Sequence, residues 1–308
     1  MNKKIGNSLI TVIIVLLMII PLHTEMAMAQ EDKVDNTKTY IVYDCVTGEE
    51  SEMVVESGAN SEIEEHYGQY EEELSDTAYD SIQGNASRII IPGGELERVD
   101  VTKSPYSKIL CLKLGIDYDG DGDTDDWSYG TGFMVYLDIM LTAGHNIYTP
   151  NYGRIVEMQI YVYQQGETLK DAYITPLKYS VSPELVKGNY DQYDWAVVIL
   201  PQELGRTTGW FQYATAEAGM QTYVTVSGYP YKEGYSHYQY ESIGLFQRYN
   251  PYYFRHKCST LDGMSGAPAY DSDGVVWGIH TKYDEDDKSY NGGMLIAPDL
   301  CDLIDSWK

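Results

Sequence analysis

The stretch Gly263-Met264-Ser265-Gly266-Ala267-Pro268 lies in the last sixth of this 308-residue chain, and the rest of the sequence is best interpreted from it. Gly263 has no Cβ, so its amide can turn toward a bound carbonyl group. The amides of Gly263 and Ser265 can then form an oxyanion hole, with the Ser265 hydroxyl as a nucleophile. A plain surface turn of Gly, Ser and Pro is the alternative, so the assignment needs a base and a group that orients it.

Two upstream segments supply these groups. His145 ends the apolar run Leu141-Thr142-Ala143-Gly144-His145, and Asp194 opens the strongly apolar run 195–200. The order His145, Asp194, Ser265 is that of chymotrypsin, and it differs from the orders in the other two large serine hydrolase folds. In such a triad the histidine is the general base and the aspartate orients it.

With these residues in place, the chain resembles the trypsin-like serine proteases, and within them the glutamyl endopeptidases secreted by Gram-positive bacteria. The resemblance runs from about Ile89 to the carboxyl terminus. It implies an all-β fold of two antiparallel six-stranded barrels, with the active site between them and a C-terminal helix. The fragments that carry it are Thr142-Ala143-Gly144-His145, Asp194-Trp195-Ala196, Val226-Ser227-Gly228-Tyr229-Pro230, the nucleophile hexapeptide 263–268, and Gly278-Ile279-His280.

The pattern of apolar residues independently predicts an antiparallel all-β protein, because short runs rich in Val, Ile and Tyr alternate with turn residues. One helix is expected near the end of the chain, where apolar residues recur every three or four positions and Asp299 is placed to cap it. The expected strands are 109–116, 132–136, 158–163, 195–200, 223–229, 275–279 and 294–296.

The first 29 residues have the features of a secretory signal peptide. Two lysines precede an apolar run, and Ala27-Met28-Ala29 offers a cleavage site before Gln30. The run is too short for a convincing membrane span, and no later segment is long and apolar enough to be an anchor. We therefore expect a secreted, extracellular protein.

Residues 30–88 contain sixteen Asp and Glu against three Lys and Arg. Such a composition is typical of a disordered acidic tail. A pro-segment is the preferred interpretation, because Arg88 precedes the apolar run that starts at Ile89, as an activating cleavage by an Arg-cutting protease requires. The resemblance also implies a mature chain that begins with such a segment. The protease domain is then 89–308, with barrels at roughly 89–205 and 206–308.

Charge and cysteine content limit the partners. The whole chain has a formal net charge of −26, the predicted mature part keeps one near −14, and Lys and Arg do not cluster. Such acidity argues against nucleic acids and anionic membranes as partners. The mature part would hold an odd number of cysteines, so at most one disulfide can form within it. We expect a monomer that acts on proteins or peptides and requires no cofactor.

An acidic loop interrupts the first predicted hairpin. Asp117, Asp119, Asp121 and Asp123 alternate with other residues, and Gly122 stands at the sixth place, as in a calcium loop. The twelfth place is a serine where such loops have a bidentate Glu, and no helices flank the loop. A structural calcium ion and a solvated acidic hairpin tip both remain open.

Specificity is predicted from positions that the resemblance assigns to the substrate pocket. Ser259 stands where trypsin has an Asp, so a basic substrate side chain would lack a counter-charge. In the glutamyl endopeptidases, the positions of Thr260 and His280 hold the substrate carboxylate, and the new α-amino group, here of Ile89, lies nearby. The other histidines, His237 and His256, are expected to be surface residues. Acidic residues 284–287 depart from the family pattern and weaken the expectation for efficiency and for the Glu-over-Asp ratio.

The sequence thus predicts a secreted serine endopeptidase, made as a zymogen, that uses His145, Asp194 and Ser265 to cleave after Glu and less well after Asp. The alternatives are a trypsin-fold protease of another specificity, a secreted pseudoprotease, and a calcium-dependent binding protein.

Overall fold

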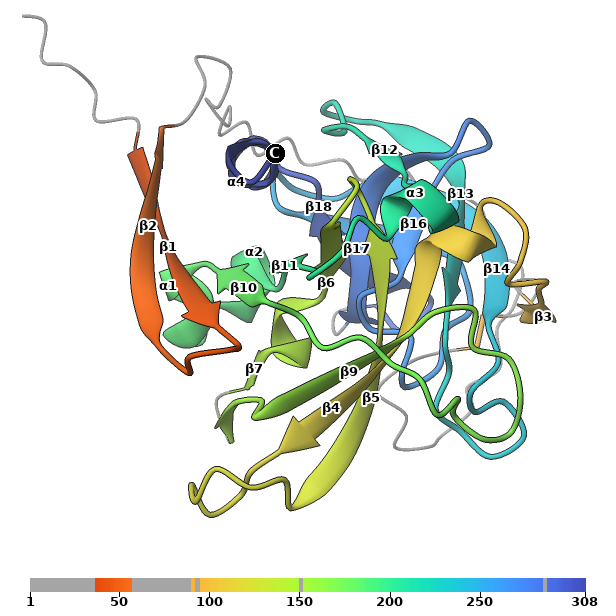
Figure 1. Ribbon diagram of the computed structural model, residues 1–308. Coiled ribbons are helices and arrows are strands. Elements are labelled where there is room, and N and C mark those ends of the chain that lie inside the picture. Colours follow the sequence, from red (N-terminus) through yellow and green to blue (C-terminus); the bar gives the residue numbers. More distant parts are fainter. Residues whose placement is uncertain (1–36, 57–89, 92–94, 150–151, 285–286) are drawn as a thin grey trace, which may run out of the picture. The chain divides into compact units, whose positions relative to one another are not determined.

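Two sheets, both built almost wholly from antiparallel pairs, contain nearly all the strands (Figure 1). The computed structural model describes residues 37–56, 90–91, 95–149, 152–284 and 287–308, which fall within one unit, Asn36–Lys308. The predicted signal peptide, most of the predicted pro-segment and Ile89 lie outside the described residues.

Among the described residues, the first sheet has eight strands in the order β2-β1-β10-β11-β6-β5-β4-β9. Six of them come from the predicted protease domain. The other two, β1 and β2, come from the predicted pro-segment and extend the sheet beyond β10. The bounds are β1 (Thr37–Asp44), β2 (Glu50–Glu56), β4 (Ile109–Ile116), β5 (Asp126–Met134), β6 (Ile139–Thr142), β9 (Glu157–Tyr161), β10 (Lys178–Val181) and β11 (Ala196–Ile199).

The second sheet closes on itself, because β17 pairs with β18 as well as with β16. The closed ring of six strands is β17-β16-β13-β14-β15-β18. Two short strands add to the ring, β12 parallel to β17 and β3 antiparallel to β14. The bounds are β3 (Glu97–Arg98), β12 (Gln212–Tyr213), β13 (Gln221–Gly228), β14 (Tyr240–Arg248), β15 (Tyr253–His256), β16 (Pro268–Tyr270), β17 (Val275–Tyr283) and β18 (Asn291–Leu295).

Helices are short except for the last one. In the described residues they are η1 (Tyr106–Lys108), η2 (Gly144–Asn146), α1 (Pro183–Val186), α2 (Tyr190–Tyr193), α3 (Gly205–Thr208) and α4 (Pro298–Ser306), and β7 (Tyr148–Thr149) pairs with β8 (Gly153–Arg154). The expected C-terminal helix is thus present as α4. Its N-cap is Ala297 and not the expected Asp299, because Pro298 is the first residue of the helix. Asp299 therefore lies inside the first turn.

Strand β4 of the first sheet is buried on both faces, which explains why it reads as a continuous apolar run. On β4, Leu110, Leu112 and Leu114 belong to one core cluster, whereas Ile109 and Cys111 belong to another. The second cluster also contains residues of α4 and of the second sheet, such as Leu300 and Ile279. Alternate residues of one strand therefore fill the core of the first sheet and the contact between the two sheets.

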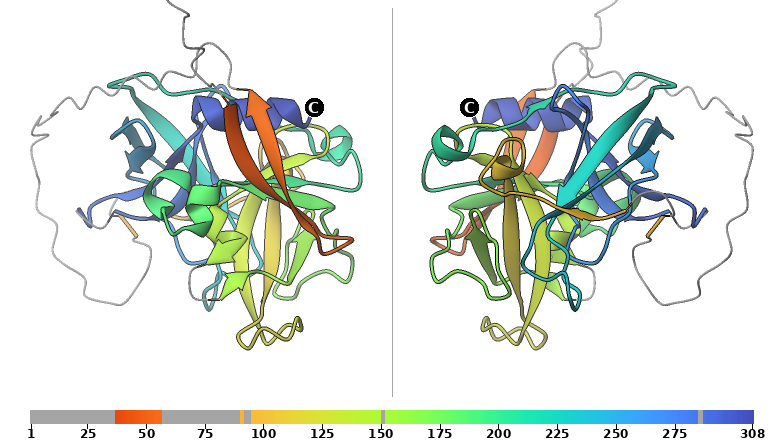
Figure 2. Two further views of the ribbon diagram at one scale, coloured as in Figure 1. Left: turned by 90° about the vertical axis from the view of Figure 1, so that its left-hand side faces the viewer. Right: turned by 90° about the vertical axis from the view of Figure 1, so that its right-hand side faces the viewer.

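The expected chymotrypsin-like fold class is confirmed: the protein is mostly β, with one closed six-stranded barrel, a second sheet that does not close in the described residues, and a C-terminal helix. The hairpin of β1 and β2 was not foreseen, and the expected domain boundary at Ile89 does not coincide with the edge of the sheet. Figure 2 shows this hairpin close to α4, and the Tyr40 hydroxyl donates to the carbonyl of Asp299 at 3.0 Å.

Candidate active site

Ser265 lies in a tight loop between β15 and β16 of the second sheet and is only 3% exposed. The N–H of Ala267 donates to the Met264 carbonyl at 3.0 Å, and the N–H of Gly266 donates to the His280 carbonyl at 2.8 Å. Gly266 has a φ of 90°, a conformation that favours glycine. A Cβ there would lie 2.0 Å from the Thr131 carbonyl oxygen. Glycine at position 266 is thus required by the backbone.

Gly263 is also a position that only glycine fits. Its φ is 89°, and a Cβ would lie 2.6 Å from both the Tyr229 carbonyl oxygen and the Tyr231 nitrogen. The preceding carbonyl, of Asp262, accepts a hydrogen bond from the Tyr231 N–H at 2.6 Å. Because C=O and N–H point in opposite directions across a trans peptide, the Gly263 N–H points away from Tyr231. This fixed orientation is what a candidate oxyanion donor needs.

The register of the first sheet brings His145 and Asp194 together. Ala196 on β11 pairs with Thr142 on β6 in an antiparallel ladder, so Asp194 lies opposite the short η2 helix that holds His145. The backbone N–H of His145 donates to Asp194 Oδ1 at 2.7 Å. Its Nδ1 lies 3.0 Å from Oδ1 and 2.8 Å from Oδ2. The carboxylate is buried and the imidazole is partly exposed.

This geometry fixes the imidazole tautomer. An ionised carboxylate only accepts hydrogen bonds, so the proton of a neutral His145 sits on Nδ1. The lone pair is then on Nε2, the nitrogen away from Asp194. That is the protonation state of a general base.

A buried polar network joins the nucleophile loop to the strand that leads into His145. Thr131 on β5 is its centre: its Oγ1 donates to the Gly263 carbonyl at 2.9 Å, and its N–H donates to the Ser265 carbonyl at 2.8 Å. Asn146, the residue after His145, donates its side-chain amide to the same Ser265 carbonyl at 2.9 Å. Ser265 and His145, from different sheets, are thus held in one network. In this arrangement, the Ser265 hydroxyl donates to the Thr281 carbonyl at 3.3 Å.

The predicted specificity residues are buried in the second sheet. Thr260 is fully buried, and in the described part of the chain its hydroxyl has no hydrogen-bond partner. His280, on β17, is also fully buried. Its Nδ1 lies 3.1 Å from the Gly292 carbonyl oxygen and 3.1 Å from Nε2 of His256. Ser259 Oγ accepts from the Ile91 N–H at 2.6 Å and donates to the Ile91 carbonyl at 3.2 Å.

The expectation that His256 is a surface residue is wrong. The side chain is completely buried, and burial lowers its pKa to about 3. The acidic residue Asp284 is also not a free charge near the pocket, since it is buried and forms a bidentate ion pair with Arg255. Sequence analysis also missed Thr131 and Asn146. Both lie on elements with a recognisable signal, but their partners are more than 100 residues away.

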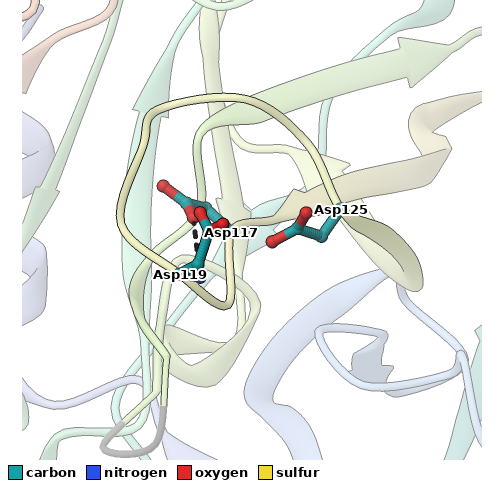
Figure 3. Close-up of side chains that lie close together, drawn as sticks. All are labelled: Asp117, Asp119 and Asp125. Carbon is teal, nitrogen blue, oxygen red and sulfur yellow. Dashed lines mark hydrogen bonds between the residues drawn. The ribbon is translucent and has the colours of Figure 1, made fainter.

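The acidic loop joins β4 to β5 and places Asp117, Asp119 and Asp125 together (Figure 3). One carboxylate oxygen from each lies within 4.8 Å of the others. Asp117 accepts the N–H groups of Gly122 and Gly120 at 2.8 and 2.6 Å, and these bonds hold its pKa below the usual range. In the described residues, Asp121 and Asp123 are not part of the cluster. Three carboxylates are a donor set that suits calcium, although fewer than the six to eight oxygens it takes.

Comparison with known proteins agrees with the fold. Residues 130–279 match the sequence model of the trypsin-like peptidase domain. The chain is 26% identical to the glutamyl endopeptidase of Bacillus licheniformis over 188 residues, which span 58% of this chain and 59% of that protein. It thus matches about three-fifths of that relative's length. It is also 26% identical over 227 residues to the extracellular metalloprotease of Bacillus subtilis, covering 71% of this chain and 69% of that protein.

A solved structure supports the fold independently. A Glu endopeptidase determined in complex with MPD superposes with a TM-score of 0.61 and 21% identity, covering 71% of this chain and 99% of that one. The likeness defines the class of fold, which is chymotrypsin-like. Residues 130–279 form a trypsin-like peptidase domain, and the chain is similar to a glutamyl endopeptidase. A search of the described residues finds no helix of the length and apolarity that a membrane span requires.

Proposed function

We propose that the protein is a secreted serine endopeptidase that hydrolyses peptide bonds on the carboxyl side of Glu, and less well of Asp. The observation that carries the proposal is the pairing of His145 with Asp194, together with a rigid Ser265 loop tied to the same network. Secretion rests on the signal-peptide features of the sequence and fits the extracellular protease among the relatives.

The chemistry follows from the positions of these groups. Ser265 Oγ attacks the substrate carbonyl carbon while His145 Nε2 takes its proton. The oxyanion that forms is stabilised by the N–H groups of Gly263 and Ser265, a donor of this kind being worth about 3 to 4 kcal/mol. The imidazolium then protonates the leaving amine, and a water molecule hydrolyses the acyl-enzyme by the same steps in reverse. Asp194 holds the tautomer and stabilises the imidazolium.

Specificity for Glu is supported by donors at the pocket residues and by the absence of a carboxylate at Ser259. Because burial keeps His256 neutral, it has one ring proton to place. Its Nδ1 accepts from the Cys258 N–H at 3.3 Å, so the proton is on Nε2 and is donated to His280 Nδ1. The proton of His280 is then on Nε2, where it can donate to a substrate carboxylate.

Maturation by cleavage after Arg88 fits the position of Ile91. Ser259 stands at the predicted base of the pocket, and it binds both the N–H and the carbonyl of Ile91. A chain that begins at Ile89 would place its α-amino group two residues, or about 7 Å at most, from this anchor. Its positive charge would then add to Thr260 and His280 in binding a carboxylate. A Glu-specific pocket cannot readily accept Arg88, so a separate Arg-cutting protease is required.

The test combines a cleavage profile on a peptide library with two pocket variants. Thr260→Val and His280→Ala should each lower kcat/KM for cleavage after Glu by about 10-fold to 100-fold, since each removes a hydrogen bond to a charged group. Hydrolysis of a small, non-acidic activated ester should change little. Thr207→Val makes the same chemical change at an exposed site on α3 and should affect neither substrate.

Two results would contradict the proposal. A library profile without preference for Glu would contradict the proposed specificity but not the proposed protease activity. Failure of an organophosphate to label Ser265 in the processed protein would remove the protease and favour a pseudoprotease.

A further inference from the structure

The hairpin of β1 and β2 is part of the protease fold, although it precedes the predicted maturation site. β1 pairs with β10 from Ile41↔Val181 to Asp44↔Lys178, and the Cys45 N–H extends the pairing to the Leu177 carbonyl at 2.8 Å. β10 in turn pairs with β11, the strand that follows Asp194. The hairpin is therefore two strands away from the segment that carries the candidate catalytic aspartate.

The inner face of the hairpin is buried in the protease core. Tyr40 and Val55 belong to the same apolar cluster as Trp195 and Leu300, and the Tyr40 and Trp195 rings lie 6.0 Å apart. On the opposite face of β1, the Tyr43 ring stacks on the Tyr179 ring, with 5.0 Å between the ring centroids. An acidic tail that merely preceded the enzyme would not bury aromatic side chains in this way.

The hairpin also contacts α4 and β8. Tyr40 donates to the Asp299 carbonyl in the first turn of α4, and Arg154 lies over the Tyr43 ring at 3.5 Å. Exposed ion pairs join Asp44 to Lys178 and Glu50 to Arg154, at 3.4 and 3.5 Å. Such exposed pairs add little energy, so the aromatic burial and the strand pairing account for most of the attachment.

Removal of the hairpin would expose two parts of the protease domain, and each exposure would be unfavourable. β10 would become an edge strand with unpaired N–H and C=O groups, which templates aggregation. Trp195, now almost fully buried, would lose the cover of Tyr40 directly beside Asp194. A protease reduced to residues 89–308 would thus lack a part of its own fold.

We propose that residues 37–56 stay bound to the enzyme as a separate, noncovalently held fragment after the chain is cut between Arg88 and Ile89, and that they support the segment around Asp194. This rests on the proposed maturation site. The hairpin is thus a permanent subunit of the active enzyme and not an inhibitor that leaves on activation.

The first experiment reads retention by mass and so does not depend on activity or specificity. The Ser265→Ala precursor, which cannot digest itself, is cut with trypsin to completion at Arg88, and the product is passed through gel filtration under native conditions. Intact-mass analysis should find the fragment with residues 37–56 and the fragment from Ile89 in one peak at equal amounts. A protease fragment that elutes folded and without the hairpin would overturn the proposal. Lack of cleavage at Arg88 would overturn the maturation site, and a cleavage sequence engineered at that position then gives the retention result on its own.

The second experiment uses neighbouring residues on opposite faces of β2. Val55 is 6% exposed and Val54 is 61% exposed. Val55→Asp should release the hairpin fragment after cleavage and lower kcat on a small ester by at least 10-fold, whereas Val54→Asp should retain the fragment and the wild-type rate. Release in Val55→Asp with an unchanged rate and thermal midpoint would overturn the supporting role. If Val55→Asp fails to fold, the gel filtration of the cleaved Ser265→Ala precursor still decides retention.

Discussion

The second sheet closes into a barrel from its own strands, whereas the first sheet depends on strands from outside the predicted protease domain. In the second sheet, the pairing of β17 with β18 gives each strand of the ring two neighbours. In the first sheet, the protease strands end at β9 and β10, and β1 covers the β10 edge. One half of the candidate active site therefore lies on a self-contained ring, and the other half lies on a sheet that is completed by strands from outside the predicted protease domain.

This difference divides the candidate site. Ser265, Thr260 and His280 come from the closed ring and its loops, and they are fixed by local turns and adjacent strands. His145 and Asp194 come from the extended sheet, and their contact depends on the register of β6 and β11. Loss of the nucleophile should thus affect the reaction alone. Damage to the first sheet, or to the Thr131 network that joins the two sheets, should also displace the candidate catalytic residues.

The largest expected effect is that of Ser265→Ala. The change removes one oxygen from a loop held by backbone bonds, so we expect folding and thermal midpoint to stay close to wild type. Turnover of peptides should fall by about 10⁴-fold or more, as for other triad nucleophiles. Peptide hydrolysis and calorimetry on the purified variant measure the two quantities. Substantial turnover by the variant, free of other proteases, would remove the triad assignment.

The joint between the two sheets is tested at Thr131. Thr131→Val removes the hydroxyl that donates to the Gly263 carbonyl and accepts from the Tyr229 N–H, both at 2.9 Å. The buried carbonyl and N–H then lose their partner, which costs about 1 to 3 kcal/mol of unfolding free energy. The displaced oxyanion donor should lower kcat/KM by about 10²-fold.

Thr131→Ser keeps the hydroxyl and is the matched control, expected to restore most of the rate. Denaturant unfolding and ester hydrolysis provide the measurements. If Thr131→Val and Thr131→Ser have equal activity, the hydroxyl does not join the sheets in the way argued above.

Sequence predicted the loops that carry the candidate site and the strands with continuous apolar runs better than it predicted the edge of the first sheet. The Gly-x-Ser-Gly turn has a local cause, since Gly263 and Gly266 have positive φ and no room for a side chain. The strand at 109–116 was placed with its observed bounds because its apolar run is continuous. The order of His145, Asp194 and Ser265 likewise needs no structure.

Features that depend on distant partners could not be predicted. The strand β1 has an apolar core at Tyr40 to Tyr43, but its acidic surroundings favoured a tail, and only the edge of β10 shows what it pairs with. His256 has no motif of its own, and its burial beside His280 follows from the closure of the second barrel. A single sequence carries these long-range pairings only implicitly.

Burial of His256 in the closed ring makes the stability of the protein depend on pH. The folded pKa is about 3, below the ordinary value of 6.5 that the unfolded chain would have. Between these values, the unfolded state binds the proton and the folded state does not. The unfolding free energy therefore has its full value, as far as His256 is concerned, above pH 6.5 and decreases as pH falls toward 3. The slope is about 1.4 kcal/mol of unfolding free energy per pH unit.

Denaturant unfolding of Ser265→Ala with and without His256→Gln, at several values between pH 3 and 6.5, measures this slope. Other groups titrate in the same window, so the quantity of interest is the difference between the two proteins. His256→Gln should be less stable at pH 7 yet lose less stability on acidification. Parallel curves would mean that His256 is not buried as a neutral imidazole.

The smallest expected effect belongs to the acidic loop of the first sheet. Calcium bound by Asp117, Asp119 and Asp125 would stabilise the β4–β5 connection, and a weak extracellular site with a dissociation constant of about 0.1 to 1 mM would add roughly 1 to 2 kcal/mol at a few millimolar calcium. The thermal midpoint of Ser265→Ala should therefore rise with calcium, fall with a chelator, and respond much less to magnesium.

The structure distinguishes two neighbouring carboxylates, because Asp119 lies in the cluster and Asp123 does not. Asp119→Asn should then abolish the rise of the thermal midpoint with calcium, while Asp123→Asn should keep it. Equal losses would restore the alternating ligand set expected from the sequence, and no calcium shift in any variant would mean that the loop is a solvated acidic tip.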